Sequence, residues 1–132
     1  MKTLIAYYSK TGNTRRVAEK VQTALSCDFD EIQFNQDSRS VVSALNPEDY
    51  DLVILMCPIW GFTLSEPMAL YLHQHKANIR RYRLAVTCGG MGLRGCISNC
   101  NKILAAPPEA AVKIKAKSIR NDSFSIPDII AK

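Results

Sequence analysis

Six consecutive small or polar residues, 9–14, stand between an apolar run and a helical pattern. Such a loop leaves backbone N–H groups without helical partners, and the positive end of the helix dipole lies behind them, an arrangement that binds anions. Gly12 lets the chain close around a phosphate, and Lys10 is the only cation in the loop. The segment predicts a phosphate-monoester site, although the same residue types also favour a turn and a helix N-cap. Its candidates are Ser9, Lys10, Thr11, Gly12, Asn13 and Thr14.

The only tryptophan of the chain, Trp60, follows the most hydrophobic run of the sequence. Side chains directly after a buried strand usually face solvent or a ligand, and a large aromatic side chain there offers a stacking surface for a planar ring. The alternative is that Trp60 folds back over the sheet. The segment "PIWGF" supplies the candidates Pro58, Ile59, Trp60, Gly61 and Phe62.

A third segment, "TCGGMGLRG", has four glycines within a few residues. A loop of this kind brings bare backbone close to a ligand, so its N–H and C=O groups can meet the polar edge of a ring. It is also typical of a flexible turn. The candidates here are Thr87, Cys88, Gly89 and Gly90.

Strands and helices alternate along the chain and position these segments. Strands are predicted over 3–8, 29–35, 51–57, 83–88 and 111–119, and helices from Asn13, from Ser40 to near Asn46, over 65–77 and over 94–105. Short, continuous apolar runs are typical of strands buried on both faces of a parallel sheet. Five strands with four helical crossovers predict an α/β fold with a doubly wound parallel sheet, in a single domain over residues 1–132.

Ligands of doubly wound sheets bind beyond the carboxyl ends of the strands, where the winding reverses. All three candidate segments follow predicted strands, so they should meet at this edge. An anion-binding loop, an aromatic platform and a glycine-rich loop together predict a site for a phosphorylated planar heterocycle.

With these segments in this order, the chain resembles a short-chain flavodoxin over nearly its whole length. "SKTGNT" is similar to the family's Ser/Thr-x-Thr-Gly-x-Thr loop for the phosphate of flavin mononucleotide (FMN), "PIWGF" to its first flavin loop and, more loosely, "TCGGMG" to its second. The resemblance implies a flavodoxin-like, three-layer α/β/α fold with strand order 2-1-3-4-5 and FMN as the cofactor.

The resemblance also implies roles for the candidate residues. Residues 9–14 would wrap the phosphate, and Trp60 would stack on the isoalloxazine ring. The Gly61 peptide would lie near flavin N5, where its carbonyl can turn toward the proton gained on one-electron reduction. The backbone of residues 87–90 would meet the pyrimidine edge.

The sequence departs from the family in its second flavin loop and in its charge. Where many flavodoxins have a stacking tyrosine and a nearby acidic residue, this chain offers Met91, Leu93 and Arg94. Familiar flavodoxins are strongly acidic, whereas this chain has a formal net charge of +5. We therefore expect the second reduction of the flavin to occur at a less negative potential than in flavodoxins generally.

A third departure is expected at the end of the chain, where a short tail, "RNDSFSIPDIIAK", stands in place of the family's final helix. The helix is expected to be absent natively or removed by truncation, and the sequence leaves both alternatives open. In the preceding strand, alternation places Lys113, Lys115 and Lys117 on one face. The sheet face left open is expected to be partly covered by the tail or to form a homodimer. The tail residues concerned are Phe124, Ile126, Ile129 and Ile130.

Composition excludes several function classes. No apolar run approaches the roughly 20 residues that span a bilayer, and the start turns polar too early for a secretory signal, so a cytoplasmic location without membrane contact is expected. The basic residues are scattered, which argues against nucleic acid. The five cysteines are expected to be reduced thiols. Cys96 and Cys100 could share a metal, but small core residues are the preferred interpretation, and no metal site is predicted.

Three functions remain open. The preferred one is an FMN-binding electron-transfer flavoprotein that passes electrons to a protein partner, and no catalytic residue is assigned. One alternative is an FMN-dependent NAD(P)H:quinone-type reductase. The other is a non-redox binding module that keeps the fold. An electron carrier is expected rather than a stand-alone oxidoreductase.

Overall fold

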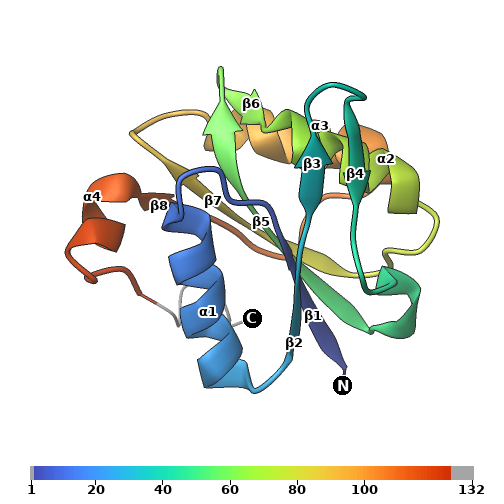
Figure 1. Cartoon of the computed structure of the whole chain (residues 1–132), viewed down its shortest axis with the longest axis horizontal. Helices are drawn as coiled ribbons and strands as arrows, with labels where there is room; N and C mark the ends of the chain where they lie inside the picture. Colours follow the sequence, from blue (N-terminus) through green and yellow to red (C-terminus); the bar gives the residue numbers. More distant parts are fainter. Residues whose placement is uncertain (1, 126–132) are drawn as a thin grey trace.

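The computed structural model describes residues 2–125 and contains the predicted parallel sheet. Five strands pair in parallel in the order β2-β1-β5-β7-β8 (Figure 1). Their bounds are β1 (Thr3–Tyr7), β2 (Asp28–Glu31), β5 (Leu52–Trp60), β7 (Tyr82–Cys88) and β8 (Ala111–Lys115). Counted along the chain this is the order 2-1-3-4-5, so the predicted fold class is confirmed. A short strand, β6 (Thr63–Leu64), pairs antiparallel with the end of β5.

Helices cover both faces of this sheet. The helices α1 (Asn13–Leu25) and α4 (Ala116–Arg120) belong to one face, and α2 (Glu66–His75) and α3 (Leu93–Leu104) to the other. In β5, Ile54 and Met56 join the core beneath α1, while Val53 and Leu55 join the core beneath α2 and α3. All four are buried, which explains the unbroken apolar run. In residues 2–125 no helix is both long and apolar enough to span a membrane.

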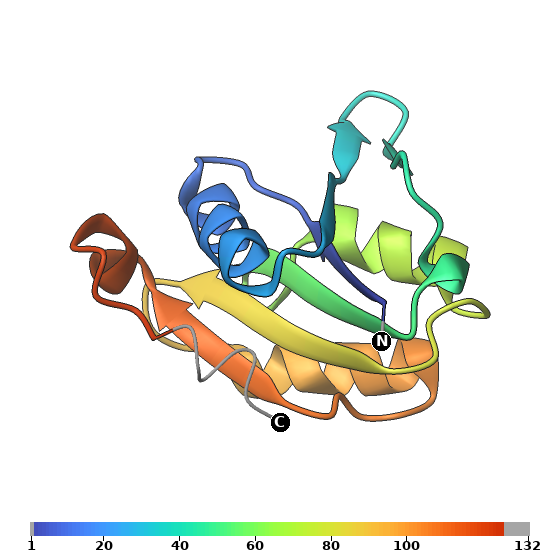
Figure 2. The ribbon, with the colours of Figure 1, turned by 90° about the horizontal axis from the view of Figure 1, so that it is seen from below.

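The crossover from β2 to β5 differs from the prediction. The expected strand over 29–35 is divided between β2 and β3 (Gln33–Asn35), and the expected helix from Ser40 is replaced by β4 (Ser40–Val42). β3 and β4 form a separate antiparallel ribbon that projects from the main sheet (Figure 2).

Local chemistry explains this correction. Two adjacent valines in β4 favour a strand, because their β-branched side chains are stiff at χ1. The buried Asp30 carboxylate then accepts hydrogen bonds from the backbone N–H groups of Ala44 and Leu45, at 3.2 and 2.8 Å. These contacts hold the returning chain in a non-helical conformation. The 3-10 helix η1 (Pro47–Asp49) follows, with Asn46 as its cap.

The last predicted strand is shorter than expected, because it ends at Lys115 and α4 begins at the next residue. Ile119 of α4 is fully buried against the face that α1 covers, and Phe124 is partly buried there. Lys113 and Lys115 are exposed, as the alternation predicted. Within residues 116–125 no longer helix follows β8. The expected contributions of Ile126, Ile129 and Ile130 lie outside the described residues, and the homodimer stays a prediction.

Candidate ligand-binding site

The three predicted segments meet at the carboxyl edge of the sheet, along the upper side of Figure 1. The ends of β1 and β7 lie beside the last part of β5, since Tyr7 lies opposite Met56 and Thr87 opposite Pro58. Side chains also join the segments. The hydroxyl groups of Thr14 and Thr87 lie 2.9 Å apart, and the Lys10 ammonium lies 5.4 Å from the centroid of the Trp60 ring.

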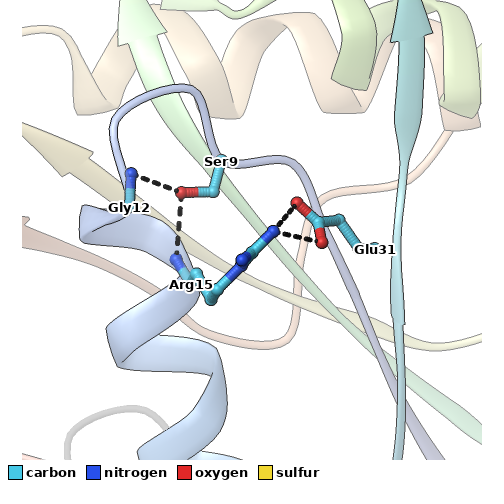
Figure 3. Close-up of polar contacts among 4 residues, drawn as sticks. All are labelled: Ser9, Gly12, Arg15 and Glu31. Atoms are coloured by element: carbon cyan, nitrogen blue, oxygen red, sulfur yellow. Dashed lines mark hydrogen bonds and ion pairs between the residues drawn. The ribbon is translucent and has the colours of Figure 1, made fainter.

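The loop before α1 is shaped by a serine and a glycine (Figure 3). Ser9 Oγ accepts hydrogen bonds from the N–H groups of Gly12 and Arg15, at 3.1 and 3.2 Å. Gly12 has a φ of +99°, which residues with a Cβ rarely adopt. The backbone N–H groups of Thr11 and Asn13 have no acceptor among residues 2–125. The loop therefore presents free donors at a helix N-terminus, which suits an anion.

An ion pair fixes the orientation of this helix start. Nη2 of Arg15 contacts both carboxylate oxygens of Glu31, at 2.5 and 2.6 Å, and so joins the first turn of α1 to the end of β2 (Figure 3). The pair neutralises the Arg15 charge. Lys10 is exposed and forms no ion pair in the described part of the chain, so its charge beside the loop donors is not neutralised.

The buried side chain of Thr14 joins two of the predicted segments. Its side chain is buried, with 2% of its surface exposed, and its hydroxyl pairs with that of Thr87. A buried hydroxyl needs such a partner, so the pair links the first loop to the end of β7. What Thr14 presents to the loop is its backbone N–H, which also has no acceptor within residues 2–125.

Trp60 is the last residue of β5, because the strand continues past Cys57 through Pro58. Gly61 and Phe62 then form a two-residue turn in which both φ angles are positive, as in a type I′ turn. The Trp60 side chain is half-buried, and its ring meets the ring of Tyr8 edge-on at 5.8 Å. Tyr8 therefore braces Trp60 at the sheet edge. This contact between Tyr8 and Trp60 was not predicted from the sequence. The one sequence feature that could have indicated it is the position of Tyr8 directly before Ser9, at the end of the first strand.

The glycine-rich loop packs against the turn after Trp60. Gly92 precedes α3 with a φ of +122°, and a Cβ on it would lie 2.7 Å from the Ile59 side chain. A Cβ on Gly95 would lie only 2.1 Å from the carbonyl oxygen of Phe62. Sequence reasoning assigned the ligand contacts to Gly89 and Gly90 and gave no role to Gly92 or Gly95. The structure shows that this second pair lets the start of α3 approach Ile59 and Phe62 closely.

We predict that Gly95→Ala destabilises the protein by about 1–3 kcal/mol, the usual range for overpacking. In an ordinary helix, replacing glycine by alanine raises the free energy of unfolding by up to about 1 kcal/mol. A decrease in the free energy of unfolding would therefore indicate the close approach of Phe62. The matched control is Gly90→Ala, because a Cβ there meets nothing within 4 Å and no positive φ is involved. Urea unfolding of both variants measures the effect. A Gly95→Ala protein as stable as the wild type would contradict the close approach.

Five cysteines are free in the structure, and Cys57, Cys96 and Cys100 are fully buried. Burial raises the pKa of the Cys96 and Cys100 thiols to about 12 in each case. Neutral, buried thiols behave as small apolar groups, so this pair belongs to the core beneath α2 and α3. In the described residues no three histidine, cysteine, aspartate or glutamate side chains gather as a metal site.

Comparisons with known proteins agree with this arrangement. A model of the flavodoxin domain matches residues 4–121. A flavoprotein from Lactobacillus acidophilus, solved in complex with FMN, has a TM-score of 0.74 and 20% identity, covering 92% of this chain and 97% of that one. The oxidised flavodoxin 2 of Bacillus cereus has a TM-score of 0.62 and 19% identity, with 93% of each chain covered.

A flavodoxin from the domain Archaea has a TM-score of 0.61 and 15% identity, and covers 98% of this chain and 96% of that one. At these identities the solved structures show a shared fold. No curated protein matches the chain.

Proposed function

The chain belongs to the flavodoxin family, and from this we propose that it binds FMN and carries electrons through it to a protein partner. The observation that supports the proposal most strongly is the set of loop donors. The backbone N–H groups of Thr11, Asn13 and Thr14 have no acceptor in the described structure, in a loop that Ser9 and Gly12 hold open. These donors fit a phosphate monoester, so the residues present fit the cofactor.

The loop is suited to hold a phosphate and not to transform it. Apart from Lys10, its side chains are neutral hydroxyl and amide groups, which do not serve as general acids or bases. Lys10 is placed to contribute charge from the side of Trp60, because its ammonium already lies over that ring. The residues of this loop thus bind and orient the ribityl phosphate end of the cofactor.

Trp60 and the glycine-rich loop would hold the ring end. The half-buried indole, braced by Tyr8, supplies a flat apolar surface at the sheet edge. Gly89 and Gly90 approach without side chains, and a Cβ on either would meet open space. When bound, the flavin supplies the redox chemistry, and the protein sets its orientation and its electrostatic environment.

The test is a visible absorption spectrum after FMN is added and the excess is removed. We expect the wild type to retain a flavin band and Trp60→Ala to bind FMN about tenfold more weakly, because stacking on an aromatic ring contributes about 1–3 kcal/mol. Trp60→Phe is the matched control and should keep most of the affinity. In the wild type, quenching of the Trp60 fluorescence on titration with FMN gives an independent measure of the affinity.

The outcomes separate the candidate functions. If neither the wild type nor Trp60→Ala retains flavin, the electron-transfer proposal falls and a non-redox binding module is favoured. If the flavin is retained and is bleached rapidly by NADH or NADPH alone, the reductase is favoured over the carrier.

A further inference from the structure

A group of cations borders the glycine-rich loop, and we call Arg94, Lys113 and Lys115 the basic rim. Arg94 lies in the first turn of α3, and Lys115 lies opposite Cys88, the last residue of β7. Lys113 Nζ donates a hydrogen bond to the carbonyl oxygen of Gly90 at 3.2 Å. All three cations are exposed, and none forms an ion pair with a carboxylate of residues 2–125.

No acidic residue of the surrounding segment offsets this charge. From Cys88 to Asn121 the only carboxylate is that of Glu109. Glu109 lies at the opposite edge of the sheet, where its N–H bonds to the carbonyl oxygen of Tyr82 at the start of β7. Its carboxylate is engaged by Arg81, at 2.5 and 2.9 Å. Within residues 88–121, no carboxylate therefore lies near the basic rim to neutralise its positive charge.

Apolar side chains lie beside the basic rim. Met91 and Phe62 are 75% and 64% exposed, which is unusual for large apolar residues. Met91 borders a shallow pocket of about 360 Å³ that Arg94 and Lys113 also line. The backbone of Phe62 lies beside this pocket, because Gly92 lines the pocket and a Cβ on Gly92 would lie 3.1 Å from Phe62 Cα. An exposed apolar centre with charged residues around it is the usual anatomy of a protein interface.

We propose that this surface, formed by the basic rim with Met91 and Phe62, docks an acidic redox protein; the inference rests on the proposed function. Carboxylates of the partner would meet the basic rim, and its apolar surface would meet the two exposed side chains. Complementary charge accelerates association and selects the partner, and methionine adapts to different surfaces. The surface is continuous with the loop assigned to the pyrimidine edge, so a docked partner comes close to the flavin ring.

The probe is a plant-type [2Fe–2S] ferredoxin, an acidic one-electron carrier, titrated into the isotope-labelled protein with and without FMN. We expect amide shifts concentrated at residues 61–63, 91–97 and 113–115, and a dissociation constant that rises with added salt. The double variant Arg94→Glu with Lys115→Glu should weaken binding at least tenfold. Neither side chain forms a hydrogen bond or ion pair with another residue of 2–125, so the fold should be kept.

The matched control is Lys76→Glu with Lys102→Glu, which changes the net charge equally at exposed positions at the ends of α2 and α3. Equal weakening by both pairs would show general electrostatic attraction and overturn a local docking surface. So would shifts centred on the β3–β4 ribbon, tighter binding of basic cytochrome c, or no ferredoxin binding at low salt. If the protein binds anionic vesicles through the same three cations and does not bind ferredoxin, the proposed protein partner is wrong and the surface binds a membrane instead.

Failure of this inference is distinguishable from failure of the proposed function, because docking is read by amide shifts and FMN binding by absorbance. A protein that retains FMN but ignores ferredoxin would lose only the docking surface. A protein that binds ferredoxin at the basic rim but takes up no flavin would lose only its electron-carrier role.

Discussion

Riboflavin is expected to bind at least a hundredfold more weakly than FMN, a difference of about 2.7 kcal/mol. The two ligands share the ring that Trp60 would contact and differ only in the phosphate. Hydrogen bonds from backbone N–H groups to an ionised phosphate are charge-assisted and stronger than neutral ones. Thr11, Asn13 and Thr14 offer such N–H groups without a competing acceptor in the described chain. Titration of the Trp60 fluorescence with each ligand gives the ratio.

Gly12 provides the variant that tests the same loop. Its φ of +99° strains any residue with a Cβ, whereas the space around it is open, so Gly12→Ala acts through backbone conformation alone. The variant should lose most of the difference between FMN and riboflavin while its riboflavin affinity stays close to that of the wild type. Equal affinities of the two ligands for the wild-type protein would mean that the loop caps α1 and holds no phosphate.

The sequence predicted best those features that neighbouring residues determine. The loop over residues 9–14, the start of α1 and the buried strand that leads to Trp60 depend on local residue types, and the structure has the loop, the helix start and the strand at the predicted places. The parallel sheet followed from apolar runs that are buried on both faces, such as that of β5. Once the strand order is known, the carboxyl edge brings the three loops together without further information.

Contacts between distant segments account for what the sequence did not reveal. The prediction of a helix from Ser40 was wrong because Asp30, in a different strand, accepts hydrogen bonds from the backbone of Ala44 and Leu45. Gly95 matters because Phe62 approaches it, and single-sequence patterns contain no such pairing. The Thr14 side chain likewise faces Thr87, which lies in a distant strand, so its type alone suggested a ligand contact.

Alkaline pH should unfold the protein through groups that are neutral only because they are buried. Burial raises the pKa of Cys57, Cys96 and Cys100, the last two to about 12. In the unfolded chain these thiols ionise at about pH 8.5. Above that pH the unfolded state binds fewer protons than the folded state, so the free energy of unfolding decreases. Their contribution is complete below pH 8.5 and is lost progressively as the pH rises toward 12.

The expected loss is about 1.4 kcal/mol per pH unit for each thiol, or about 4 kcal/mol per unit for the three together. A domain stable by about 5–15 kcal/mol should then unfold between about pH 10 and 12. Tyr50 adds to the loss above about pH 10, because its hydroxyl donates to Asp28 and its pKa is raised to about 12.

Urea unfolding at a series of pH values from 8 to 11 measures this slope, and Cys100→Ala is the informative variant. Removing a buried thiol leaves a cavity that lowers stability at every pH, whereas the loss of one titrating group reduces the slope by about a third. The two effects therefore separate within one experiment. A slope that is unchanged in Cys100→Ala, or a wild type whose stability is flat up to pH 11, would show that these thiols ionise within the fold and that the core beneath α2 and α3 admits water.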